Sequence, residues 1–310
     1  MLSKIWLVLK GSAEEWRLDN ASRLAAALSY YTIFSIAPLL VMAIAVASLV
    51  FGEKAASNQL FSQIRGLVGD QGALAIQSMV ENVHKTGGGV LATLVGIITV
   101  LIGASGAFGQ LQSALNTVWQ VRPKPGQGVK GFIRIRFLSF SMVLVIGFML
   151  LVTLVISAAL AGMGNYLDAV LPIPAMVIQA LNFLISFGVT TLLFTLIYKV
   201  LPDVTIKWKD VWIGGCFTAL LFSLGRFLIS IYLGRSTFSS AYGAAGSLVI
   251  ILAWIYYSAQ ILFFGAEFTK VYATTFGSDI RPSHNAEAVT AENSVHAGIA
   301  IHTPKRRNEG

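Results

Sequence analysis

Residues 201–272 decide the fold of this chain, and they read LPDVTIKWKDVWIGGCFTALLFSLGRFLISIYLGRSTFSSAYGAAGSLVIILAWIYYSAQILFFGAEFTKVY. Two apolar runs lie in this stretch, at 211–233 and 247–264. Each run is close to the roughly 20 residues that a helix needs to cross a bilayer. The connector at 234–246 is rich in Gly, Ala and Ser, so the stretch predicts a pair of transmembrane helices joined by a tight turn.

The composition of the whole chain supports a membrane protein. Of the 310 residues, 55% are hydrophobic and 12% are charged, whereas soluble domains carry about 25% charged residues. The mean hydropathy is +0.73. Helices satisfy their own backbone hydrogen bonds in lipid, so we predict an all-α polytopic membrane protein. The one cysteine, Cys216, excludes an intrachain disulfide.

Apolar runs on either side of the opening stretch extend the prediction to a bundle of six spans within residues 24–272. The expected spans are 24–51, 90–108, 137–161, 175–198, 211–233 and 247–264. Residues 1–23 read as an amphipathic segment on the cytoplasmic surface. Residues 53–89 read as a pair of amphipathic surface helices on the outer side, broken at 69–72. Residues 273–310 are polar and lack periodicity, which predicts a disordered cytoplasmic tail.

The positions of Lys and Arg predict that both termini are cytoplasmic. With the N-terminus inside, the inner segments hold 17 of the 22 basic residues and the outer segments hold 4. Positive charges gather on the cytoplasmic side of membrane proteins. This distribution accounts for the net charge of +8 without nucleic acid as a partner. The basic inner loops are expected to attract anionic lipid head groups.

Several stretches together resemble a known family. The opening stretch combines Leu-Pro at 201–202, Ser-Ala-Tyr-Gly at 240–243, Trp-Ile-Tyr-Tyr at 254–257 and Gly-Ala-Glu at 265–267. Residues 27–38 and 106–119 add two upstream matches. The combination is similar to the YihY/BrkB family over roughly residues 20–275. The resemblance implies a multi-pass protein of the bacterial inner membrane, in a family some of whose members are labelled ribonuclease BN.

The residues do not favour an enzyme. Metal-assisted phosphodiester cleavage needs clustered His, Asp or Glu ligands, and the acids before the tail show no such spacing along the chain. Those expected on the cytoplasmic side are Glu14, Glu15, Asp19, Asp203 and Asp210. No Walker loop, HExxH or CxxC motif is present. We therefore expect no catalytic residues, no metal and no cofactor.

Arg226 is the sharpest candidate for a binding residue, because it lies deep inside a predicted span. A charged side chain at that depth costs about 2.5–3.5 kcal/mol on insertion scales. At the same depth the neighbouring spans offer Asn182, Thr153 and Ser157 rather than an acid. One interpretation is a structural arginine whose side chain reaches outward to the head groups. The other is a site for an anion such as a lipid phosphate, bound by Arg226 and those three polar residues.

Further residues are candidates for structural or gating roles. Pro38 should kink the first span, because proline removes one helical hydrogen bond. Tyr30, on the same span, reads either as an interfacial aromatic or as part of a cavity wall. Tyr242 and Gly243 belong to the Gly-rich connector. Glu267 reads as an inner-face anchor that pairs with a basic loop residue such as Lys207 or Lys209, with a gating role as the alternative.

These observations give two hypotheses for function. The first is a non-enzymatic protein that binds and moves an anionic amphiphile, such as a lipid, across or within the inner membrane. The second is a structural or assembly factor of the cell envelope, with protein partners and no transported substrate. No Asp or Glu lies in any predicted span, which disfavours a proton- or cation-coupled carrier.

Overall fold

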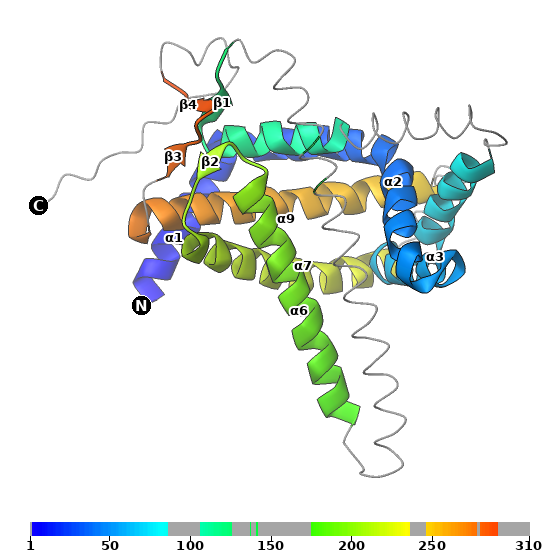
Figure 1. Cartoon of the computed structure of the whole chain (residues 1–310). Coiled ribbons are helices and arrows are strands. Elements are labelled where there is room, and N and C mark those ends of the chain that lie inside the picture. Colours follow the sequence, from blue (N-terminus) through cyan, green and yellow to red (C-terminus); the bar gives the residue numbers. More distant parts are fainter. Residues whose placement is uncertain are drawn as a thin grey trace, which may run out of the picture.

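In the computed structural model, the chain is described over residues 2–85, 106–125, 175–235, 246–277 and 280–290, and at the single positions 137 and 141. The described residues are mostly helical, as predicted (Figure 1). The helices are α1 (Leu2–Leu18), α2 (Ala21–Phe51), α3 (Glu53–Lys85), α6 (Ala175–Val200), α7 (Trp208–Arg235) and α9 (Gly246–Phe276). A further helical stretch covers residues 106–118.

Three helices in the described residues are long and apolar enough to cross a membrane: Phe183–Val200, Trp208–Leu228 and Leu248–Phe276. A fourth candidate is α2, which bends by 50° between Ala21–Ala37 and Leu39–Ala45. The break falls at Pro38, where the missing N–H was expected to kink the helix. Almost all of the expected spans at 90–108 and 137–161 lies outside the described residues.

Helix α9 is the central element of the bundle, because it contacts α1, α2, α3 and α7. Figure 1 shows α2, α7 and α9 running lengthwise through the molecule, with α6 crossing beside α7. One apolar core joins α9 to α2, α6, α7 and the 106–118 helix; among its most buried side chains are Leu115, Val118, Tyr198 and Phe263. A second core joins α9 to α2 and α3.

Two glycines allow α7 and α9 to approach closely. A Cβ placed on Gly214 would lie 1.8 Å from Thr269 Oγ1, and one on Gly265 would lie 2.0 Å from Thr218 Oγ1. Both distances are far below a van der Waals contact. The hydroxyl groups are satisfied inside the bundle, because Thr218 donates to Gly214 O at 2.7 Å and Thr269 donates to Gly265 O at 2.7 Å.

Helix α3 carries a buried stripe and bends back on itself. Its buried side chains recur at helical spacing and face α2 and α9; they are Ala56, Leu60, Ile64, Val68, Ala73, Ile76 and Val80. Ser57 and Glu81 line one pocket, although a straight helix would separate them by about 36 Å. Helix α3 therefore turns back between Phe61 and Gln77, an interval that contains the break predicted at 69–72.

The segment after α9 is a correction to the expected disordered tail from residue 273. Helix α9 continues to Phe276, and two short strands follow, β3 (Arg281–Pro282) and β4 (Ala286–Ala288). Strand β4 pairs antiparallel with β1 (Val121–Pro123), and β3 pairs antiparallel with β2 (Val204–Thr205). The segment is ordered because both loops offer it free backbone donors and acceptors. Residues 291–310 lie outside the described part of the chain.

Candidate functional site

Arg226 lies on α7 inside the candidate span Trp208–Leu228, and its side chain is exposed. Its neighbours Leu224, Phe227 and Leu228 are also exposed, by 55%, 61% and 54%. No hydrogen bond or ion pair joins Arg226 to another residue within the described part of the chain. The guanidinium therefore lies on an apolar surface of the described helices, without a carboxylate beside it there.

The residues expected around Arg226 are not brought together by the described part of the chain. Asn182 is in α6, but its side chain is not among those described. Thr153 and Ser157 lie outside the described residues, as do Tyr242 and Gly243. The anion site predicted from the sequence therefore stays a prediction.

Tyr30 lies on an exposed face of α2, with 60% of its surface accessible. Its ring makes edge contacts with Tyr31 and Phe34, at centroid distances of 5.8 and 5.1 Å. Phe34 is 68% exposed. Within the described residues these aromatic rings form an outward-facing cluster, and the roles of Tyr30 as an interfacial aromatic or as part of a cavity wall stay predictions.

Glu267 is the sequence-predicted residue around which the structure assembles a site. Its side chain is 0% exposed, and its Oε2 lies 3.5 Å from Lys270 Nζ, one helical turn along α9. The expected partners were Lys207 or Lys209, and this pairing was wrong. Helix α9 continues well past residue 264, so Glu267 has a lysine of its own helix within reach.

Two acids from the start of the chain complete the site. Lys270 Nζ donates to Glu15 Oε2 at 2.7 Å and to Asp19 Oδ2 at 3.4 Å. Glu15 is in the last turn of α1, and Asp19 lies in the turn between α1 and α2. Gln120 Nε2 donates to the other oxygen of Asp19 at 2.9 Å. We call Glu15, Asp19, Glu267 and Lys270 the Lys270 cluster.

The Lys270 cluster contains more negative than positive charge. Carboxylate oxygens of Glu15, Asp19 and Glu267 all lie within 4.8 Å of one another. The Asp19 and Glu267 side chains are 1% and 0% exposed, while Lys270 and Glu15 are 14% and 23% exposed. Because the Lys270 ammonium is within ion-pair distance of all three acids, it supplies the positive charge that a bound cation would otherwise supply.

Sequence reasoning missed Glu15 and Asp19. Both were named only as acids without a metal-ligand spacing, and both are about 250 residues away from Glu267 in the sequence. A weak signal was present, because Glu15 and Asp19 are four residues apart and share one face of a helix. Only the contact between α1 and α9 brings these acids to Glu267.

A second buried polar network lies in the described residues and joins two of the stretches that resembled a family. Asn116 Nδ2 donates to Asp203 Oδ2 at 2.9 Å, and Asp203 N donates to Asn116 Oδ1 at 2.8 Å. Gln112 Nε2 adds a longer bond to the same carboxylate oxygen, at 3.3 Å. The network fixes the loop after α6 on the 106–118 helix, which is a structural role.

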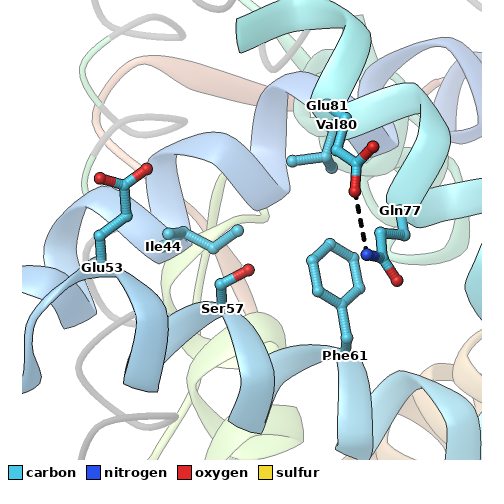
Figure 2. A pocket seen from close by; sticks show the side chains of 7 residues that line it. All are labelled: Ile44, Glu53, Ser57, Phe61, Gln77, Val80 and Glu81. Atoms are coloured by element: carbon cyan, nitrogen blue, oxygen red, sulfur yellow. Dashed lines mark hydrogen bonds between the residues drawn. The ribbon is translucent and has the colours of Figure 1, made fainter.

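One cavity of about 290 Å³ lies where α3 folds back (Figure 2). Figure 2 shows Phe61 on one arm of α3 pointing towards Gln77 on the other, with the bond from Gln77 Nε2 to Glu81 Oε1 at 2.9 Å. The residues that line the cavity are Ile44, Glu53, Ser57, Phe61, Gln77, Val80 and Glu81. The residues that line this cavity are far from both Arg226 and Glu267 in the sequence.

The long apolar helices and their buried polar contacts define a helical membrane protein. A sequence model of the family described as Virulence factor BrkB matches residues 12–290, so the chain belongs to this family. The chain is 28% identical over 297 residues to a UPF0761 membrane protein of Halorhodospira halophila, covering 94% of this chain and 62% of the relative. It is 28% identical over 268 residues to one of Pseudomonas paraeruginosa, covering 82% and 60%.

A further relative extends the comparison to a third genus. The chain is 27% identical over 262 residues to a UPF0761 membrane protein of Verminephrobacter eiseniae, which covers 83% of this chain and 60% of the relative. The chain thus spans about three fifths of the length of these relatives. No solved structure matches it. The relatives' names establish a membrane protein and state no substrate.

Proposed function

We propose that this membrane protein binds an anionic amphiphile through Arg226 and moves it within or across the bacterial inner membrane, without catalysing a reaction. The observation that carries the proposal is the exposed guanidinium among exposed apolar side chains of a candidate span. A charge in such a place is costly unless it finds a partner. An anionic head group can provide that partner, while its acyl chains contact Leu224, Phe227 and Leu228.

The remaining residues of the proposed site have distinct roles. Asn182, Thr153 and Ser157 would donate hydrogen bonds to the head group beside the guanidinium, since hydrogen bonds to charged groups are the stronger ones. The bend at Pro38 and the connector residues Tyr242 and Gly243 would allow the helices to close around the ligand. Tyr30 would then contact lipid at the surface of α2.

Native mass spectrometry of the purified protein, after mixing with phosphatidylglycerol and phosphatidylcholine, tests this proposal. Wild type should retain phosphatidylglycerol through detergent exchange, and Arg226→Leu should lose roughly tenfold in retention. Arg226→Lys should keep part of it, because the charge remains. Lys209→Leu is the matched control, since it removes the same charge from the first turn of α7. Equal retention in all four proteins would overturn the proposal.

A structural or assembly factor of the cell envelope is the second candidate, and the cavity of α3 favours it. Glu53 and Glu81 line that cavity together with Ser57 and Gln77, which is suitable for a basic or polar side chain of a protein partner. In cells, Phe61→Ala should then abolish cross-linking to the protein partner, while Arg226→Leu leaves it intact. The reverse pattern would reject the assembly role.

A further inference from the structure

We propose that Glu267 is a proton-binding site, and that the Lys270 cluster exchanges this proton with water at the end of the bundle where α1 lies. In the conformation described here, Glu267 is the protonated member of the cluster. The proton comes from bulk water and returns to it, and no other bond changes. What the proton does for transport rests on the proposed function, whereas the binding of the proton does not.

The first observation is the state of the Glu267 carboxyl group. Neither of its oxygens accepts a hydrogen bond from any described residue, and the side chain is 0% exposed. Its contact with Lys270 is the longest of the three in the cluster, at 3.5 Å against 2.7 Å for Glu15. An ionised carboxylate in such a place would lack the hydrogen bonds that offset the cost of removing it from water. A neutral carboxylic acid requires far less compensation.

The second observation is the charge balance. Three carboxylates at mutual distances within 4.8 Å face one ammonium group, so full ionisation would leave a net charge of −2. Like charges so close together cannot all ionise, because each disfavours the charged form of the others. Glu15 has the short bond to Lys270, and Asp19 accepts from both Lys270 and Gln120. Glu267 is therefore the acid of the cluster that binds a proton most tightly.

The groups that face Glu267 from the surrounding helices support this assignment. Helix α1 and the following turn contribute Glu15 and Asp19, and α9 contributes Lys270. On the α6 side, the Tyr198 hydroxyl already donates to Leu262 O at 2.8 Å and lies 3.0 Å from Thr218 Oγ1 of α7. These two hydroxyls are therefore occupied by each other and by the backbone. Asp210 of α7 faces Gly277 instead, beyond the end of α9.

A route for the proton is also present in the described residues. Glu15 and Lys270 are 23% and 14% exposed, so they connect the buried acids with solvent. Loss of the proton would add a charge between α1 and α9 and weaken their contact. Gain of the proton would restore it. If the protein moves lipid as proposed, the cluster would couple proton binding to the position of α1. Proton binding would then be the energy source for lipid movement.

Infrared difference spectroscopy of the full chain in lipid nanodiscs tests the inference, because a protonated carboxyl group has its own carbonyl stretching band. Spectra would be compared between about pH 5 and about pH 9. Wild type should show this band near neutral pH and lose it reversibly at alkaline pH. Glu267→Gln should lack the band. Glu14→Gln should keep it, since Glu14 is an exposed neighbour outside the cluster.

Asp19→Asn is a second variant, which keeps the acceptor for Gln120 and removes one negative charge. In this variant Glu267 should bind its proton at least about tenfold less tightly, because one neighbouring negative charge is gone. The carbonyl band should then disappear at a lower pH. Absence of the band in wild type, or an unchanged titration in Glu267→Gln and Asp19→Asn, would overturn the inference. Lipid retention by Arg226 is measured separately, so either proposal can fail while the other stands.

Discussion

Lys270 donates a hydrogen bond of 2.7 Å to Glu15, a residue 255 positions earlier in the chain. This bond ties the last turn of α1 to α9. Glu15 is 23% and Lys270 is 14% exposed, so the pair is mostly shielded from solvent. Its neighbours Asp19 and Glu267 depend on the same ammonium group.

Replacing Lys270 by Met should destabilise the protein, because the ionised Glu15 and Asp19 would lose their common partner. Removing one partner of a buried ion pair costs about 3–5 kcal/mol, and the partial exposure of Lys270 places the expected loss near the lower end. Thermal unfolding in detergent measures it. The double variant Lys270→Met/Asp19→Asn should recover part of the loss, because Asp19 is the buried ionised acid that the lysine would leave without a partner. Equal stability of Lys270→Met and wild type would show that the cluster contributes nothing to the α1–α9 contact.

Replacing Gly265 by Ala should loosen the contact between α7 and α9. The added methyl group would lie 2.0 Å from Thr218 Oγ1 and 2.6 Å from the Tyr198 hydroxyl oxygen. Overpacking of this kind costs about 1–3 kcal/mol. Gly188→Ala is the matched control in α6, because no atom lies within 4 Å of its added Cβ. The melting temperature should fall for Gly265→Ala alone, and a fall of similar size in both would contradict the steric explanation.

Replacing Asn116 by Leu should separate the loop after α6 from the 106–118 helix. Asn116 donates to the Asp203 carboxylate and accepts from the Asp203 amide, so two buried groups would lose their partner. Each loss of this kind costs about 1–3 kcal/mol. Faster hydrogen exchange at the Asp203 amide would report it directly. Ser113→Leu, on an exposed position of the same helix, should leave that amide protected.

Replacing Glu287 by Ala should have a small effect. Its carboxylate lies 2.6 Å from Arg122 Nη2, but the two side chains are 34% and 25% exposed. Exposed and partly exposed pairs contribute about 0–1 kcal/mol, and salt screens them. The amide of Val289, which donates to Gln120 O, should exchange only slightly faster. Complete release of residues 281–288 would mean that the ion pair, rather than strand pairing, holds the segment.

The helices were largely predictable because their signal is local. Apolar runs of membrane length located α6 and α7, and the missing N–H of Pro38 located the bend in α2. The sixth span was predicted to end at 264 and the tail to begin at 273, whereas α9 continues to Phe276, because its more polar last turns pack against α1. The candidate span Leu248–Phe276 therefore contains a buried acid, Glu267, which the shorter predicted span had excluded.

The Lys270 cluster and the terminal strands could not be predicted, because both depend on contacts between distant segments. Glu15 and Asp19 carry no mark that distinguishes them from exposed acids such as Glu14. Strands of two or three residues show no periodicity, and β3 and β4 exist only because β1 and β2 lie within reach. Arg226 was singled out from its depth alone, and its surroundings remain a prediction from the sequence.

The pairing of β1 with β4 also has a consequence for biosynthesis. Arg122 and its partner Glu287 are 165 residues apart, so the ribosome needs roughly 10–30 s after making β1 before β4 is available. During that interval the loop at 121–123 has an unpaired backbone edge, which is a site for wrong association. A nascent chain stopped before residue 281 would keep both loops open. Quality-control proteases could therefore distinguish incomplete chains from finished ones at this end of the bundle.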